Sequence, residues 1–239
     1  MIFFTGDTHG RFDRFDEYQF QPDDVVVILG DSGLNYYQPK RAAFFKKTLA
    51  KYGCKFLMIH GNHEKRPEKI STYHLDTFMG GDVYVEDAFP TLFFAKDGSV
   101  FNLDGYSMLA VGGAYSVDKY YRQTMGFSWW PDEQPSEETK RHVEQVIANQ
   151  HARFDIIATH TCPFKYIPTE MFLSCIDQSR VDQSTEEWLD LIEKAVHYKA
   201  WVCGHWHTDK IVDNVRFLFN SVVSIDNLMH TYPDGVETV

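Results

Sequence analysis

Short polar motifs that carry metal-binding side chains follow five apolar runs of this 239-residue sequence. They are Gly6-Asp7-Thr8-His9-Gly10, Gly30-Asp31-Ser32-Gly33, Gly61-Asn62-His63-Glu64, Thr159-His160-Thr161 and Gly204-His205-Trp206-His207. One isolated histidine or Gly-Asp pair is most often an ordinary core or surface residue, whereas five such motifs in one chain indicate a site. Imidazole and carboxylate groups without a thiolate suit manganese, iron, zinc or nickel. The motifs therefore predict a metal centre.

The apolar runs before these motifs are the elements that must bring them together. Runs at 2–5, 24–29 and 56–60 are typical of buried parallel strands, and 154–160 and 200–203 are similar. Ligands of open α/β sheets bind beyond the carboxyl ends of the strands. We therefore expect the five strand-end motifs to meet in one crevice.

Helices and one antiparallel segment are predicted between these strands. Residues 39–52 show helical spacing, a second helix begins near Ser136, and the capping box 184–187 starts another. From 82 to 113, β-rich pieces separated by Asp-Gly pairs at 97–98 and 104–105 predict an antiparallel meander. The whole pattern predicts an α/β fold with mixed sheets, in a single domain spanning 1–239.

Composition restricts the classes of function. Lys and Arg number 23 and Asp and Glu 34, a net charge of −11 that opposes non-specific nucleic-acid binding. An anionic substrate would need a local positive centre, which bound metal could supply. We expect a cytoplasmic protein with no membrane partner, because no apolar run could span a bilayer, no leader pattern is present, and the four cysteines lack CxxC spacing.

In order and spacing, the five strand-end motifs resemble those of the calcineurin-like metallophosphoesterases, over residues 6–207. The resemblance implies a four-layered α/β/β/α sandwich, with two mixed β-sheets flanked by helices. It also implies two divalent metal ions, of which manganese is favoured and iron, zinc or nickel are alternatives. By position, one ion would be held by Asp7, His9 and His207, the other by Asn62, His160 and His205, with Asp31 bridging.

The same resemblance implies a reaction. Two cations would clamp phosphoryl oxygens and acidify a bridging water, and the resulting hydroxide would attack phosphorus in line. His63 would face the substrate as an acid or charge stabiliser, and Asp31 would be essential as the bridging carboxylate. Glu64 would either orient His63 or cap a helix that starts near Lys65.

Two departures from the protein phosphatases bear on the substrate. Ser-Gly-Leu-Asn follows Asp31 in place of Asp-Arg-Gly, and no arginine directly precedes the third motif. We therefore expect hydrolysis of a phosphomonoester or phosphodiester of a small molecule or nucleotide, with nucleic acid only as a substrate. A serine/threonine-type protein phosphatase and a non-catalytic metal-binding scaffold are the alternatives.

Four further residues are candidates for substrate binding. Tyr115, Lys119 and Arg122 lie in a stretch that could return to the metal edge, or could form a structured loop with an Asp118–Lys119 charge pair. Arg66 closely follows the third motif and is either a phosphate ligand or a surface residue. The aromatic stretch 127–135 either forms a pocket wall or packs the following helix onto the sheet.

Overall fold

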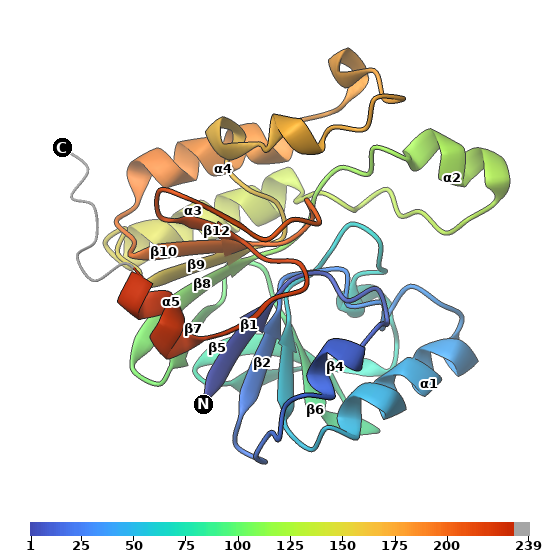
Figure 1. Ribbon diagram of the computed structural model, residues 1–239, viewed down its shortest axis with the longest axis vertical. Helices are drawn as coiled ribbons and strands as arrows, with labels where there is room; N and C mark the ends of the chain where they lie inside the picture. Colours follow the sequence, from blue (N-terminus) through green and yellow to red (C-terminus); the bar gives the residue numbers. More distant parts are fainter. Residues whose placement is uncertain (232–239) are drawn as a thin grey trace.

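The computed structural model describes residues 1–231, which form two β-sheets stacked face to face (Figure 1). The first sheet has the order β13 (Val222–Ser224), β1 (Ile2–Thr5), β2 (Val25–Ile28), β3 (Lys55–Met58), β6 (Phe89–Ala95), β5 (Gly81–Glu86), β4 (Tyr73–Phe78). The second has the order β11 (Lys210–Val212), β12 (Val215–Phe217), β10 (Ala200–Cys203), β9 (Ile156–Thr159), β8 (Tyr106–Val111), β7 (Val100–Leu103). Both sheets contain parallel and antiparallel pairs.

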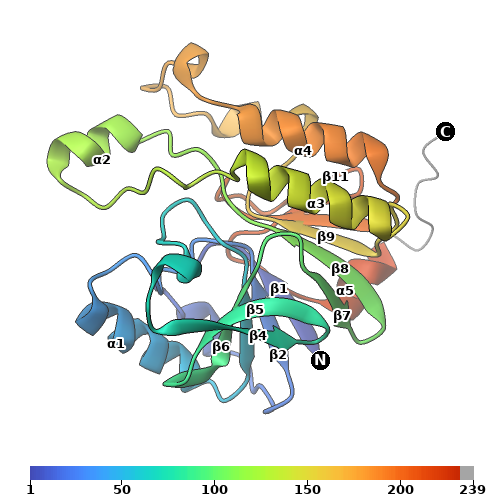
Figure 2. The same cartoon turned by 180° about the vertical axis from the view of Figure 1, so that it is seen from behind.

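Helices cover the two outer faces and complete the four layers, as Figure 2 shows from behind. Helix α1 (Pro39–Ala50) packs on the first sheet, and α3 (Glu137–Asn149) and α4 (Ser184–Ala195) pack on the second. Two shorter helices are α2 (Lys119–Met125) and α5 (Ile225–Thr231). The expected α/β/β/α sandwich is confirmed. Within residues 1–231, no helix is both long and apolar enough to cross a membrane.

Continuous apolar runs form the central strands because both of their faces are buried. Along β1, Phe4 faces the core between the sheets, whereas its neighbour Phe3 faces the layer of α1. Val27 and Val26 divide in the same way on β2. Because successive side chains of a strand point to opposite faces, an all-apolar strand contributes side chains to both cores.

The predicted helix start near Ser136 and the predicted capping box at 184–187 have different outcomes. Helix α3 does begin there, with Ser136 as its N-cap, whose side chain accepts a hydrogen bond from the amide of Thr139 at 3.1 Å. The capping box at 184–187 is wrong, because Ser184 is already the first helical residue of α4. The carboxylate of Asp182 accepts from the Ser184 amide at 3.0 Å, so an upstream residue takes that role.

The continuous meander expected for 82–113 is also wrong. The Asp104–Gly105 pair does join the antiparallel strands β7 and β8, but Asp97–Gly98 lies where the chain passes from the first sheet to the second. Strand β6 pairs in parallel with β3 instead of with β7. The Asp97 carboxylate accepts from the Gly112 amide at 2.6 Å and from Arg66 at 2.8 Å, contacts that anchor the crossing. Strand β4, polar and at the sheet edge, was not anticipated.

Candidate metal centre

The strand-end motifs meet where the carboxyl ends of β1, β2 and β3 face those of β9 and β10. His207 Nε2 lies 3.2 Å from Asp7 Oδ2 and 3.0 Å from His9 Nε2. His160 Nε2 lies 2.8 Å from Asn62 Oδ1, and its ring centroid is 5.0 Å from that of His205. All seven side chains assigned to metal binding from the sequence are therefore brought together.

Two groups of donor atoms are compact enough to hold an ion. Their atoms lie within 4.8 Å of one another in the sets Asp7, His9, His207 and Asp7, Asp31, His160. The carboxylate common to both sets is Asp7, whereas the sequence motif indicated Asp31 as the bridge. Asp31 Oδ2 nevertheless lies 3.9 Å from His9 Nδ1 and 3.9 Å from His160 Nε2, so it also faces both groups.

Unsatisfied polar atoms show that these residues fit metal ions. Asp7 is 1% exposed, and its buried Oδ2 makes no well-aligned hydrogen bond, although His207 Nε2 lies 3.2 Å away. His160 Nδ1 donates to the Leu29 carbonyl at 2.8 Å, so in the neutral ring Nε2 presents a lone pair to Asn62 Oδ1, itself an acceptor. Buried acceptors without donors are costly. A cation held by these atoms would satisfy them.

Four of the candidate ligands have a left-handed backbone. The φ angles are 47° for His9, 45° for Asp31, 64° for His205 and 49° for His207. Non-glycine residues rarely adopt this region, and the cost is on the order of 1–3 kcal/mol each. Hydrogen bonds at 2.8 Å from the His9 amide to the Asp31 carbonyl and from the His205 amide to Asp7 Oδ1 hold two of these loops.

Two glycines of the motifs leave room for the ligands. A Cβ on Gly30 would lie 2.0 Å from His160 Nδ1, and one on Gly204 would lie 2.3 Å from Asp7 Oδ1. Gly30 also has a φ of 97°. Any other residue type at either position would displace a candidate ligand.

The electrostatic environment shifts the pKa values of the two buried carboxyls, Asp7 and Asp31, in opposite directions. Burial opposes ionisation of Asp7, but nearby His207, His160 and His9 outweigh it and lower the pKa of Asp7. Burial and the charge of Asp7 raise the pKa of Asp31. Desolvation and His160 lower the pKa of His205 to about 3, so this imidazole is neutral, as a metal ligand must be.

His63 lies beside the centre without belonging to either donor group. Its Nε2 is 3.3 Å from Arg122 Nη2 and 3.4 Å from Asn62 Nδ2, and its amide donates to Asp31 Oδ1 at 2.8 Å. Burial, reinforced by Arg122, lowers the pKa of His63 to about 2. The ring is therefore neutral here and offers one N–H to a bound oxygen.

Glu64 joins two of the motif loops, in place of the two roles expected for it. Its carboxylate accepts from Ser32 Oγ at 2.7 Å and from the Gly61 amide at 3.1 Å. The next helical turn begins only at Pro67. Burial and Asp31 raise the pKa of Glu64 to about 7.

The candidate substrate-binding residues lie in different places. Tyr115 lines the cleft at the metal groups, and Arg122 pairs with Asp118 at 2.7 Å, so the expected Asp118–Lys119 pair is replaced. Lys119 lies over the Trp129 ring, 4.5 Å from its centroid. Trp129 in turn donates to Glu133 at 2.7 Å, so this part of the aromatic stretch packs locally.

Arg66 is directed away from the metal groups. It is buried, its Nη1 donates to Asp97 at 2.8 Å, and it lines a separate pocket together with His60. It is thus neither the surface residue nor the neighbour of the centre that the sequence suggested.

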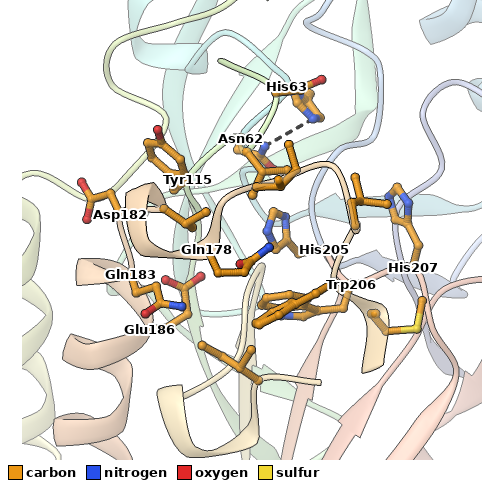
Figure 3. A pocket seen from close by; sticks show the side chains of 18 of the residues that line it. Asn62, His63, Tyr115, Gln178, Asp182, Gln183, Glu186, His205, Trp206 and His207 are labelled. Carbon is orange, nitrogen blue, oxygen red and sulfur yellow. Dashed lines mark hydrogen bonds between the residues drawn. The ribbon is translucent and has the colours of Figure 1, made fainter. Parts of the chain in front are cut away.

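A cleft of about 280 Å³ opens beside the metal groups (Figure 3). One wall comes from 164–183, which precedes α4 and contains the 3₁₀ turns Phe164–Tyr166, Thr169–Met171 and Gln178–Arg180. Sequence reasoning passed over this segment because it has neither strand nor helix periodicity. Its apolar side chains without a regular period were the only available signal.

The chain was compared with known families and structures. The family model described as calcineurin-like phosphoesterase matches residues 1–209. No curated protein matches the chain. Among solved structures, a phosphopantetheinyl hydrolase from Mycobacterium tuberculosis has a TM-score of 0.47 and 15% identity, over 100% of this chain and 96% of that one.

Proposed function

Because this chain belongs to the calcineurin-like phosphoesterases, a family of metal-dependent phosphoric ester hydrolases, we propose that it hydrolyses a phosphomonoester or phosphodiester at two divalent metal ions. The observation that carries the proposal is the convergence of five donor side chains into two compact groups that share the buried Asp7, with Asn62 and His205 beside His160. We also propose that 1–239 form a single domain, since the two sheets share one apolar core.

The ligand assignment follows the family resemblance, and its first set is also one of the two compact donor groups. Asp7, His9 and His207 would hold one ion, and Asn62, His160 and His205 the other, with Asp31 between them. When bound, divalent ions, with manganese favoured, would supply positive charge to the phosphoryl oxygens and lower the pKa of water.

The chain's own side chains would position the ester. The guanidinium of Arg122 and the ring of His63 lie 3.3 Å apart and can both donate to a phosphoryl oxygen. Because its ring is neutral here, His63 would act on the leaving oxygen as a hydrogen-bond donor that stabilises charge, the second of the two roles that the family resemblance implies for it. Tyr115 would contact the organic part of the ester from the cleft wall. Arg66 and Lys119 have no part in this assignment.

Replacement of the bridging carboxylate tests the proposal. We expect Asp31→Asn to lose metal and to hydrolyse p-nitrophenyl phosphate and its bis-ester at least about 100-fold more slowly, since even indirect partners of metals cost 10–100-fold. Metal content and manganese-dependent turnover are the measurements. Asp87→Asn, whose side chain is 97% exposed, is the control and should match the native protein.

Two results would contradict the proposal. Near-native turnover by Asp31→Asn would refute the role of Asp31. Bound metal in the native protein without hydrolysis of either ester would refute the function and favour the binding scaffold.

A further inference from the structure

The cleft beside the metal groups changes character along its length. At one end it is lined by Asp31, Asn62, His205 and His207, where the reacting phosphate would bind. Away from the metal groups, six apolar side chains form most of one wall, beside the polar side chains Gln178, Asp182, Gln183 and Glu186; the apolar ones are Ile167, Met171, Phe172, Leu173, Ile176 and Val181. Since both ends belong to one continuous cleft, a phosphoester at the centre would extend its organic group along the apolar wall.

Trp206 connects the two ends. It lies between the candidate ligands His205 and His207 and lines the cleft (Figure 3). Its ring centroid is 6.1 Å from that of Phe172. Farther out, Met171 and Leu173 are 38% and 57% exposed. Apolar surface that remains open next to a polar centre is typical of a ligand-binding groove.

Charge in the cleft restricts what this organic group can be. Among the described residues that line it, the ionisable side chains are the histidines, Tyr115 and the carboxyls Asp31, Asp118, Asp182 and Glu186. Arg122 does not line the cleft, but it is paired with Asp118 and lies beside His63 at the phosphate end. A second phosphate away from the metal groups would therefore meet carboxyl groups and apolar surface. Such a group would be desolvated without a cationic partner, which is unfavourable.

We infer that the cleft binds an uncharged, largely apolar organic group esterified to the reacting phosphate. This inference rests on the proposed function and narrows its substrates to phosphoesters of apolar alcohols. Compounds with further phosphates on the leaving group are poor substrates. The apolar wall binds the organic group while Arg122 and His63 face the phosphate.

A series of alkyl phosphates measures the contribution of the wall. On the manganese-loaded protein, kcat/KM should rise from ethyl to butyl to octyl phosphate, by up to about fourfold for each buried methylene and by roughly 30-fold or more overall. Octane-1,8-diol bisphosphate, which adds a distal phosphate to the same chain, should fall about tenfold below octyl phosphate. Calorimetry with ethyl- and octylphosphonate should give the same preference in affinity without turnover.

Variants locate the preference in the wall. Leu173→Asn and Met171→Asn should reduce the octyl-to-ethyl ratio several-fold; both side chains are partly exposed, so folding should survive. Leu191→Asn is the matched control, because Leu191 is 65% exposed on α4 and does not line the cleft. Its ratio should equal that of the native protein.

The outcomes separate this inference from the proposed function. Hydrolysis of p-nitrophenyl phosphate with equal kcat/KM for ethyl and octyl phosphate would overturn the inference and leave the function standing. Preference for the bisphosphate, or an unchanged ratio in both wall variants, would also overturn it. If no ester is hydrolysed, both proposals fail.

Discussion

Asn62 is held by a short chain of buried hydrogen bonds that begins at Glu133. Glu133 accepts from Ser116 Oγ at 2.5 Å, and Ser116 Oγ accepts from Asn62 Nδ2 at 2.8 Å. The amide orientation is thereby set, and Asn62 Oδ1 faces His160 Nε2. Because all four side chains are buried, water does not compete for these bonds. These hydrogen bonds therefore direct the amide oxygen of Asn62 toward the metal centre.

Substitution of Ser116, the middle residue of these hydrogen bonds, tests whether they position Asn62. Ser116→Ala should weaken manganese binding by about 10–100-fold, since partners that orient ligands contribute that much to metal affinity. Titration calorimetry on metal-free protein gives the dissociation constant. Ser179→Ala, at an exposed serine that bonds only to Asp177 and its own loop, should leave it unchanged. Equal affinity in native protein and Ser116→Ala would remove the positioning role.

At the scale of elements, the two long helices on the second sheet start in different ways. Helix α3 begins with a serine that caps it, whereas α4 begins after Gln183, which makes no side-chain cap. The difference follows from the residues before each helix, since Asp182 already accepts from the first amide of α4. We therefore expect Ser136 and Ser184, which look alike in the sequence, to contribute differently to the free energy of unfolding.

A pair of serine substitutions measures this difference. Ser136→Ala should lower the free energy of unfolding by about 1 kcal/mol, the usual contribution of an N-cap serine. Ser184→Ala, at the position where the sequence predicted a cap, should change it by only a few tenths. Urea denaturation of both variants beside the native protein is the measurement. Equal losses would mean that the capping assignment is wrong.

For the whole molecule, burial of ionisable groups couples folding to pH. Glu186 is buried under the cleft, with one oxygen accepting from Thr161 at 2.8 Å and the other without a partner. Burial raises the pKa of this carboxyl to about 7 from 4.5. Between these two pH values the folded state holds a proton that the unfolded state has released. The resulting stabilisation is complete below pH 4.5 and is lost as the pH rises through 7.

Glu186→Gln isolates this contribution. Relative to the variant, the native protein should lose roughly 1–3 kcal/mol of stability between pH 5 and pH 8, because ionisation of the buried carboxyl becomes costly while the amide stays neutral. Urea denaturation of the metal-free proteins at both pH values measures it. Glu137→Gln, whose side chain is 82% exposed, is the control. A difference between native protein and Glu186→Gln that does not vary with pH would contradict the prediction.

The amino-acid sequence by itself determined the α/β class with mixed sheets and the residues that gather at one edge, whereas the four-layered sandwich was implied by the family resemblance of its motifs. Each strand-end motif is local, and parallel strands place their carboxyl ends together, so Asp7, Asn62 and His205 could be assigned to one site. The start of helix α3 and the β7–β8 turn could also be predicted, because helix starts and Asp-Gly turns depend on adjacent residues.

Only the tertiary structure decided the features that depend on residues far apart in the chain. Asp97 binds Arg66 and the Gly112 amide, which places a sheet crossing where a hairpin was expected and draws Arg66 away from the centre. The left-handed backbone of four ligands, the chain from Glu133 to Asn62 and the apolar wall of 164–183 likewise arise from long-range packing. Local propensity carries no information about such contacts, because their energy exists only once distant segments have met.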